Sequence, residues 1–177
     1  MRTLIIALLI CFASYKTLAD KKYPPILTDT KDNFVNSLNH CIDWIYYDLP
    51  KEQHIPKQLV IAQAALETGW GKSRFANEGN NLFGIRTYDE DGEWLLPIPW
   101  TKWPGWGVKK YNTRCESVMD YVRIINELWA YEELRKVRDN NGDVFEMADE
   151  LNNYAKNPNY TILVKAIIKH NLGKYDL

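Results

Sequence analysis

The clearest pattern in the chain is a helical repeat of apolar residues that starts just after residue 30. The first stretch spaces its apolar side chains by four and three residues, which predicts a buried helix face made of Phe34, Leu38, Ile42 and Ile45. Asp29 or Thr30 is placed to cap this helix. Pro50 closes the segment, so the first helix is predicted to lie between these limits.

A second helix is predicted to begin at Pro56, because the first helical position does not need the N–H group that proline lacks. Gly69 and Gly71 are expected to stop it, since glycine is common just past a helix end. Residues 72–86 follow as a polar segment around a small apolar group. The inward face of the second helix is predicted to carry Leu59, Val60, Gln63, Leu66 and Glu67.

Further helical stretches follow in the C-terminal half. Thr113 and Glu116 match a capping box, and the stripe after them consists of Val118, Tyr121, Val122, Ile125, Leu128 and Trp129. A shorter turn or helix continues through Leu134 and Val137 before residues 139–142 break the chain. The last two stripes are Val144, Met147, Ala148 and Leu151 and, after Pro158, Leu163, Val164, Ile167 and Ile168, with Gly173 as the end.

Residues 87–112 have a different character. Residues 89–92 (DEDG) are a turn signal, and residues 94–100 and 108–111 suit strands. Pro97 and Pro99 lie within the first of these segments, and Pro104 and two glycines lie between the two. These features predict a small, irregular β-hairpin lobe. The fold class is therefore mainly α (α+β), with one domain at residues 31–177, a β-lobe at about 87–112 and an extended lead-in at residues 20–30.

The 177 residues and the 46% hydrophobic content are those of one ordinary globular domain. Residues 1–19 are typical of an export signal, with Arg2, an apolar stretch too short to span a bilayer, and small residues at 17–19. A retained N-terminal anchor and lipid attachment at Cys11 are the alternatives. Signal removal leaves 22 − 2 = 20 basic and 23 acidic residues, a net charge of −3. Such a chain has no overall basic surface for nucleic acid, and we expect no stable membrane insertion.

Cys41 and Cys115 are the cysteines outside this signal. An oxidising compartment would permit a disulfide between them, and two buried free thiols fit the sequence equally well. The histidines, at positions 40, 54 and 170, share no metal-ligand spacing. The chain also has no phosphate-binding glycine loop and no Gly-x-Ser-x-Gly elbow. We therefore expect no metal and no cofactor.

Glu67 is the carboxylic acid that the helical pattern singles out. It stands seven residues after Val60 and four after Gln63, so it extends the inward face at the C-terminal end of the second helix. Burial and the negative end of the helix dipole would both raise the pKa of its carboxyl. A carboxyl that keeps its proton near neutral pH can protonate the leaving oxygen of a glycoside. The alternative is a last-turn Glu that points into solvent or caps a loop.

Three sequence blocks carry a more specific signal. They are residues 63–73 (QAALETGWGKS), 79–85 (GNNLFGI) and, more weakly, 154–160 (YAKNPNY). Together they resemble the peptidoglycan endo-β-N-acetylglucosaminidases of glycoside hydrolase family 73, especially the Bax-like branch. The resemblance covers about residues 55–175. In the third block Lys156 and Asn157 stand where the family often has Thr-Asp.

The resemblance implies a lysozyme-like helical domain with a β-lobe beside a sugar-binding groove, and it implies Glu67 as the catalytic acid. It also implies that Tyr154 and Tyr160 face the substrate at the catalytic centre. The groove floor would be Asn80, Asn81, Phe83 and Gly84. Asparagine amides can bind N-acetyl and hydroxyl groups, and glycine lets backbone approach a ligand. The structural alternatives are a plain turn at the asparagines and core packing of the aromatic rings.

A second carboxylate would come from the β-lobe, where the candidates are Asp89, Glu90, Asp91 and Glu93. Glu93 is preferred because it adjoins a β segment, and the alternative is a solvated hairpin tip. Carboxyl separations of about 5–5.5 Å would indicate a retaining enzyme and about 6.5–9.5 Å an inverting one. The N-acetyl group of the substrate could also assist, which would leave Glu67 as the only essential carboxyl.

Tryptophans form a second candidate constellation, because sugar rings stack their C–H faces on large aromatic side chains. Its members are Trp70, Trp94, Trp100, Trp103 and Trp106. Among them Trp70, Trp100 and Trp103 are predicted to bind substrate, and the alternative is a compact aromatic core of the lobe. Trp44 and Trp129 lie on helical stripes and are predicted to be core residues.

The sequence thus predicts a peptidoglycan hydrolase that cuts the β-1,4 bond after N-acetylglucosamine. We expect a monomer that is periplasmic or secreted, with glycan strands as its partner. Two alternatives stay open. One is a muramidase or lytic transglycosylase that acts on the other glycosidic bond, and the other is a non-catalytic peptidoglycan-binding protein.

Overall fold

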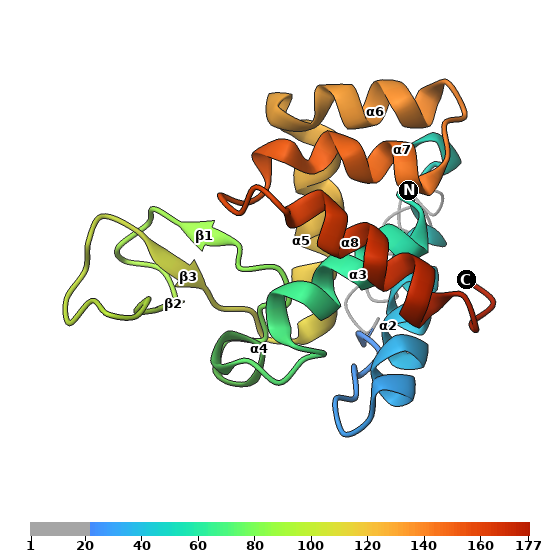
Figure 1. Ribbon diagram of the computed structural model, residues 1–177. Coiled ribbons are helices and arrows are strands. Elements are labelled where there is room, and N and C mark those ends of the chain that lie inside the picture. Colours follow the sequence, from blue (N-terminus) through green and yellow to red (C-terminus); the bar gives the residue numbers. More distant parts are fainter. Residues whose placement is uncertain (1–21) are drawn as a thin grey trace, which may run out of the picture.

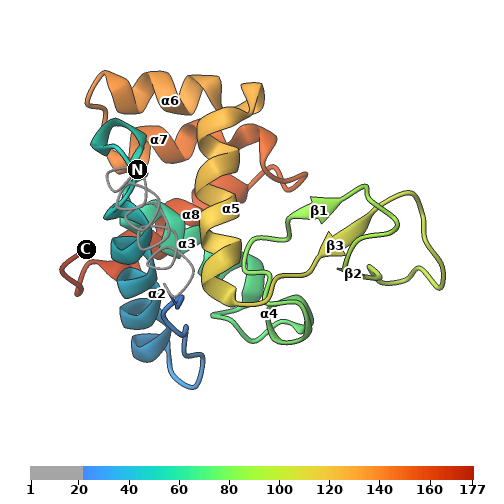
Figure 2. The same ribbon diagram turned by 180° about the vertical axis from the view of Figure 1, so that it is seen from behind.

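The computed structural model describes residues 22–177, so the predicted signal peptide lies outside the described residues. The mainly helical class is confirmed, and a small β-lobe projects from one side of the helical body (Figure 1). The helix α3 (Lys57–Thr68) lies at the centre of the body. It has α8 (Tyr160–Ile167) on one side and α5 (Arg114–Glu127) on the other, as the views in Figures 1 and 2 show.

The first two predicted helices are confirmed. α2 (Lys31–Tyr46) begins at Thr30, whose side chain accepts a hydrogen bond from the N–H of Asn33. Its predicted apolar face is buried. After the short 3-10 turn η1 (Lys51–Gln53), α3 follows Pro56 and ends at Gly69, which has a left-handed φ of 57°. Glycine adopts this conformation at little cost, which explains why the helix stops there.

One short helix is not predicted by the sequence pattern. α4 (Arg74–Glu78) lies in the segment between α3 and the β-lobe. Its N-cap is Ser73, whose hydroxyl accepts from the N–H of Ala76. With five residues, α4 is too short to show an apolar period, so the pattern does not reveal it.

The β-lobe contains a three-stranded antiparallel sheet rather than a simple hairpin. Its strands are β1 (Arg86–Thr87), β2 (Trp94–Leu95) and β3 (Gly107–Lys109), in the order β1-β3-β2. Val108 lies opposite both Arg86 and Leu95. The last strand in the sequence is therefore the central one, because the chain from β2 loops out and returns between its predecessors.

The C-terminal part follows the predicted order of helices. After α5 come the 3-10 turn η2 (Trp129–Tyr131), α6 (Glu132–Asp139), α7 (Val144–Asp149) and η3 (Glu150–Asn153). α8 then continues into a π-helical turn, η4 (Ile168–Leu172). The capping prediction at α5 is correct for Thr113, whose hydroxyl accepts from the N–H of Glu116. The carboxylate of Glu116 instead accepts from the N–H of Asn112.

Three positions of the predicted apolar stripes are exposed and not in the core. Trp129 is 83% exposed, Leu128 is 45% exposed and Leu163 is 40% exposed. α5 ends at Glu127, so Trp129 leaves the helical stripe and turns outward in η2. Trp44 is half-buried and packs against the core.

A disulfide resolves the open question about the cysteines. Cys41 in α2 is bonded to Cys115 in α5, and both residues are fully buried. The lead-in also packs on this pair of helices. Arg114 donates a hydrogen bond to the carbonyl of Ile26, and the Ile26 side chain is buried in the core. Among residues 22–177, no helix is long and apolar enough to cross a membrane.

Candidate active site

Glu67 lies in the last turn of α3, half-buried, with the exposed loop that leads to β1 in front of its carboxyl. A Cβ atom on Gly84 would stand 3.7 Å from Oε2 of Glu67. Gly84 has a φ of 65°, a conformation that other residues rarely adopt. The glycine thus leaves open space at the carboxyl, on a surface that solvent or a ligand can reach.

The turn after Glu67 is built tightly. Gly69, Trp70 and Gly71 all have positive φ values, of 57°, 66° and 79°. The buried Thr68 hydroxyl donates to the carbonyl of Ala64 and accepts from the N–H of Gly71 at 2.7 Å. A Cβ on Gly71 would stand 2.4 Å from a side-chain carbon of Thr28, so only glycine fits. This turn fixes the direction of the helix end that carries Glu67.

Burial raises the pKa of the Glu67 carboxyl above its ordinary value, and a hydrogen bond from Tyr160 opposes this shift without cancelling it. Glu67 therefore keeps its proton to a higher pH than an exposed glutamate does. A protonated carboxyl that faces an accessible space is the chemical requirement for a general acid. The expectation that burial raises this pKa is thus met.

Tyr154 and Tyr160 lie beside Glu67 and connect it to the loop of Gly84. Their rings stack with centroids 5.3 Å apart at an angle of 15°. The hydroxyl of Tyr154 donates to the carbonyl of Phe83 at 2.9 Å. Four predicted site residues are therefore joined in one cluster: Glu67 of α3, Gly84 of the loop before β1, Tyr154 just after η3 and Tyr160 of α8.

Phe83 itself is 2% exposed and stacks on Tyr121 with ring centroids 4.2 Å apart. Its ring therefore belongs to the core beneath the cluster, as the alternative interpretation held. A direct contact between this ring and a sugar is not available in this arrangement. The backbone carbonyl of Phe83 holds Tyr154, so the residue contributes to the position of the site.

Asn81 is fully buried, and its amide is completely used by the protein backbone. It donates to the carbonyls of Ile85 and Lys109 at 2.9 and 2.8 Å and accepts from the N–H groups of Phe83 and Ile85 at 3.2 and 3.1 Å. An amide has two donor hydrogens and two acceptor lone pairs. No polar atom is left for a ligand, so Asn81 shapes the loop that carries Gly84 instead of contacting sugar.

Asn80 also serves the backbone. It has a φ of 52°, and its amide donates to the carbonyls of Tyr111 and Asn112 at 2.9 and 3.1 Å. It lines a hollow with Tyr23 and Trp44, on the side of the lead-in. The turn interpretation of Asn80 is therefore correct, and no described contact links its side chain to Glu67.

The tryptophans divide between packing and exposure. Trp103 packs against Trp94 with ring centroids 4.6 Å apart, and Trp100 is 53% exposed. The guanidinium of Arg86 lies 4.0 Å from the ring centre of Trp106. The lobe thus has a small aromatic core, and Trp100 is its exposed tryptophan. Trp70 lies in the turn that follows Glu67. Its ring packs edge-on against the ring of Phe34, with the ring centroids 6.1 Å apart. The sugar contacts of Trp70, Trp100 and Trp103 stay predictions.

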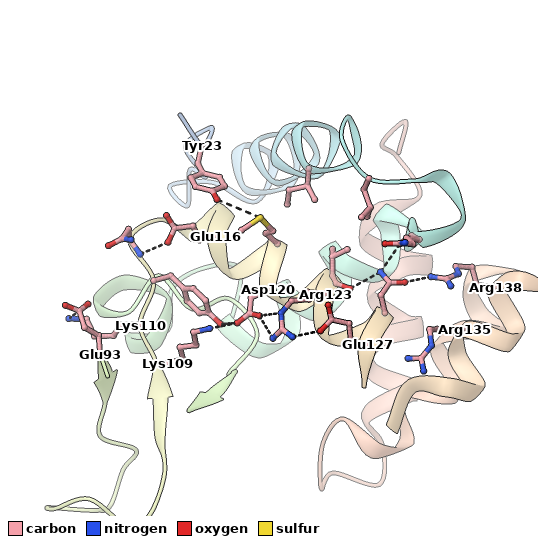
Figure 3. A pocket seen from close by; sticks show the side chains of 18 residues that line it. Tyr23, Glu93, Lys109, Lys110, Glu116, Asp120, Arg123, Glu127, Arg135 and Arg138 are labelled. Atoms are coloured by element: carbon pink, nitrogen blue, oxygen red, sulfur yellow. Dashed lines mark hydrogen bonds and ion pairs between the residues drawn. The ribbon is translucent and has the colours of Figure 1, made fainter. Parts of the chain in front are cut away.

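Glu93 lies outside the Glu67 cluster. Its side chain is 78% exposed, and its carboxylate lies 4.0 Å from the ammonium of Lys110. It lines a cavity of about 1000 Å³ that runs along α5 (Figure 3). Glu67, Tyr154 and Tyr160 are not among the residues that line this cavity. No described contact joins Glu93 to Glu67, and the role of Glu93 as a second carboxylate stays a prediction.

The polar groups in this cavity are paired with one another. The carboxylate of Asp120 accepts hydrogen bonds from Lys109, Tyr111 and Arg123, each at 2.7 Å for the closest atoms (Figure 3). Arg123 also binds Glu127 at 2.6 Å. These contacts join β3 to α5. Among the carboxyls of residues 22–177 with a shifted pKa, Glu67 is the one whose pKa is raised, whereas the pKa of Asp120 in this cavity is lowered.

Residues 22–177 contain no group of His, Cys, Asp and Glu side chains that could hold a metal ion. Gln63 and Tyr121 are the residues of the site that the sequence does not single out as functional. Gln63 is a polar residue on the otherwise apolar middle of the buried face of α3, which is the signal that could have drawn attention to it.

A mainly helical body, a small β-lobe and one half-buried acid between them are the features of the lysozyme-like class of glycoside hydrolases. Comparison with known families identifies the group within this class. The chain belongs to the glucosaminidase family, described as mannosyl-glycoprotein endo-β-N-acetylglucosaminidase, whose model matches residues 44–172. The resemblance found in the sequence blocks is thereby confirmed.

Several curated proteins are similar to this chain. It is 28% identical to exo-glucosaminidase LytG of Bacillus subtilis, over 84% of the chain and 54% of LytG. It is 36% identical to Protein bax of Escherichia coli, over 48% of the chain and 28% of that protein. It is 28% identical to peptidoglycan hydrolase FlgJ of Vibrio parahaemolyticus, over 81% of the chain and 48% of FlgJ. The chain thus spans about half of these relatives or less.

The fold has a counterpart among solved structures. The catalytic domain of the autolysin Auto from Listeria monocytogenes superposes with a TM-score of 0.61 at 24% identity. The match covers 93% of this chain and 96% of that domain. At this identity the likeness establishes the fold, and the chemistry has to be argued from the site.

Proposed function

We propose that the protein is a peptidoglycan hydrolase that cleaves the β-1,4 glycosidic bond after N-acetylglucosamine, with Glu67 as the general acid. The observation that supports this proposal is the Glu67 carboxyl, whose pKa is raised by burial and which faces the open space at Gly84. Membership of the glucosaminidase family and the names of the relatives agree with this substrate class.

In the first step, Glu67 transfers its proton to the glycosidic oxygen while the bond from that oxygen to the sugar C1 breaks. The hydroxyl of Tyr160 stabilises the carboxylate that forms, because a hydrogen bond to the charged form favours it. Water then adds to C1, and its proton restores the acid. The substrate's own N-acetyl oxygen is the group we propose to assist at C1, since Glu93 has no described contact with the Glu67 cluster.

The substrate is proposed to bind along the surface between the helical body and the β-lobe. Tyr154 and Gly84 would contact the sugar next to the cleaved bond, and Trp70, Trp100 and Trp103 would stack on sugars farther away. Asn80, Asn81 and Phe83 would support this surface from below. We infer that the mature protein works as a monomer in the periplasm or after secretion. The export-type N-terminus and the disulfide between Cys41 and Cys115 fit such an oxidising location.

Digestion of purified sacculi by wild type, Glu67→Gln and Glu93→Gln tests the proposal, with product analysis by mass spectrometry. We expect reducing-end N-acetylglucosamine from the wild type, a loss of at least about 100-fold in Glu67→Gln because general acid catalysis supplies that much, and near-normal activity in Glu93→Gln. The exposed Glu93 is the matched control, since the same chemical change there leaves the Glu67 cluster intact.

Different products would point to different functions. Reducing-end N-acetylmuramic acid, or its anhydro form, would establish the muramidase or lytic transglycosylase alternative. Absence of any cleavage by the wild type, together with binding to sacculi, would indicate a peptidoglycan-binding protein. Full activity in Glu67→Gln would refute the assignment of the acid. Inactivity of Glu93→Gln would restore the lobe carboxylate as a second catalytic group.

A further inference from the structure

The buried polar side chain behind Glu67 is Gln63, one turn earlier on α3. Gln63 is 0% exposed and lies between helices α5 and α8. Its amide nitrogen donates to the hydroxyl oxygen of Tyr160 at 3.0 Å, and its amide oxygen accepts from the hydroxyl of Tyr121. Tyr160 in turn is hydrogen-bonded to Glu67. Three helices thus contribute to one chain of polar groups that ends at the proposed acid. Figures 1 and 2 show α3 lying between α5 and α8.

The direction of each hydrogen bond in this chain follows from the number of protons available. The hydroxyl of the fully buried Tyr121 uses its single proton on the Gln63 oxygen. The Gln63 nitrogen then faces Tyr160 and can only donate, so the Tyr160 oxygen accepts. The hydroxyl proton of Tyr160 is then donated to the Glu67 carboxyl, which is the other hydrogen-bond partner of Tyr160. Tyr160 is therefore a donor to Glu67 whether the carboxyl is charged or neutral.

We propose that Gln63, held in place by Tyr121, is a positioning residue that keeps the Tyr160 hydroxyl pointed as a donor at Glu67. The acid proton then prefers the carboxyl oxygen that does not face Tyr160, because a carbonyl oxygen accepts the Tyr160 hydrogen bond better than a protonated carboxyl oxygen does. The proton is directed to the other oxygen, where it is free for the glycosidic oxygen of a substrate. This inference rests on the proposed function, and it adds the residues that orient the acid.

Reversal of the amide would have the opposite effect. If the Gln63 oxygen faced Tyr160, the Tyr160 proton would bind it and Glu67 would lose its donor. A carboxylate that loses a hydrogen bond is less stable, so its pKa rises. Tyr121 prevents this reversal. A reversed amide would place its NH2 group against the Tyr121 hydroxyl, and the hydroxyl proton of Tyr121 would then lose its acceptor. Tyr121→Phe removes the restraint while the ring remains to stack on Phe83.

The experiment measures the pKa of Glu67 directly, by NMR titration of protein labelled with 13C at glutamate carboxyls. Loss of one resonance in Glu67→Gln assigns the signal. We expect the Glu67 pKa to rise by about 0.5 to 1 unit in Tyr121→Phe, because part of a hydrogen bond to a charged group is lost. Gln63→Glu should raise it as well, since a carboxylate at 63 would take the Tyr160 proton.

Tyr131→Phe is the matched control. Tyr131 belongs to the same tyrosine cluster, 6.3 Å from Tyr154 between ring centres, and is 8% exposed. Among residues 22–177 its hydroxyl has no recorded hydrogen bond to Gln63, Tyr160 or Glu67. We expect no change of the Glu67 pKa in this variant. Far-UV circular dichroism of each variant identifies any that fails to fold. If one of the two test variants, Tyr121→Phe or Gln63→Glu, does not fold, the other still tests the inference.

The rate of sacculus cleavage gives a second readout. Activity requires protonated Glu67, so it falls as pH rises through the pKa of this group. The basic limb of the pH profile should move upward in Tyr121→Phe by the same amount as the NMR titration, and stay in place in Tyr131→Phe. An unchanged Glu67 pKa in folded Tyr121→Phe and Gln63→Glu would overturn the inference. An inactive wild type with a shifted NMR titration would instead refute only the proposed function.

Discussion

At the scale of single residues, two glycines near Glu67 share a backbone conformation but have different surroundings. Gly84 has a φ of 65° and a position where a Cβ would stand 3.7 Å from Oε2 of Glu67. Gly69 has a φ of 57° and nothing within 4 Å of an added Cβ. The first glycine therefore keeps space free at the acid, whereas the second serves only to end α3.

Gly84→Ala and Gly69→Ala separate these two roles. Each alanine should lower the free energy of unfolding by about 1–2 kcal/mol, the cost of a left-handed conformation with a Cβ. Gly84→Ala alone should also reduce the rate of sacculus cleavage by about tenfold or more, because small displacements at a reacting centre are costly. Chemical denaturation and a turnover assay measure the two effects. Equal losses of turnover in both variants would contradict the role of Gly84.

At the scale of elements, the β-lobe is fastened to the helical body by the Asp120 carboxylate. Asp120 projects from α5, and its side chain is 11% exposed. Burial works to raise the pKa of this carboxyl, but hydrogen bonds from Lys109, Tyr111 and Arg123 outweigh it, so the pKa lies below its ordinary value. Lys109 belongs to β3, the central strand, so this one carboxylate anchors the sheet as a whole.

Asp120→Asn should weaken this attachment and lower the free energy of unfolding by about 1–3 kcal/mol, since partly buried donors lose a charged acceptor. Asp149→Asn is the control, because Asp149 is 55% exposed and its ion pair with Lys165 should contribute little. Urea denaturation compares the two variants. A loss in Asp120→Asn no larger than in Asp149→Asn would show that the attachment has another basis.

The pH dependence of the Asp120 effect has a definite sign. A carboxyl with a lowered folded-state pKa stabilises the protein above its unfolded-state pKa of about 3.9 and loses this contribution as pH falls through the folded value. The stability difference between wild type and Asp120→Asn should therefore be constant near neutral pH and shrink below about pH 4.

At the scale of the whole molecule, one disulfide connects parts of the chain that are distant in sequence. Cys41 and Cys115 are 74 residues apart, and their bond joins α2 to α5 across the buried core. The segment between them includes α3, Glu67 and the β-lobe. A cross-link of this length restricts the unfolded chain strongly, which stabilises the folded state.

The variant in which both Cys41 and Cys115 are replaced by alanine should unfold more easily than the wild type by about 2–5 kcal/mol. Calorimetry in the presence and absence of a reducing agent measures this. Reduction should lower the melting temperature of the wild type towards that of the variant and leave the variant unchanged. If full reduction did not change the melting temperature of the wild type, the disulfide would add no stability.

The helices and the half-buried place of Glu67 at the end of α3 were predictable from the sequence, because both depend on local patterns. The faces of α2 and α3 follow from apolar spacing, and the position of Glu67 follows from its distance to Val60 and Gln63. Trp129 was mispredicted, since its stripe continued beyond the point where α5 ends. The short helix α4 gave no periodic signal, and the pairing of β3 between β1 and β2 depends on a long loop rather than on local spacing.

The sequence by itself determined the fold class and the family, and it singled out Glu67 as the candidate acid. Only the tertiary structure decided how the other residues serve that acid. Asn81 looks like a ligand-binding residue in the chain, but the fold uses all of its hydrogen bonds. Gln63 looks like an ordinary helix residue, but the fold places it between two tyrosines. The physical reason is that helix formation depends on near neighbours, whereas the partners of a buried polar group come from distant segments.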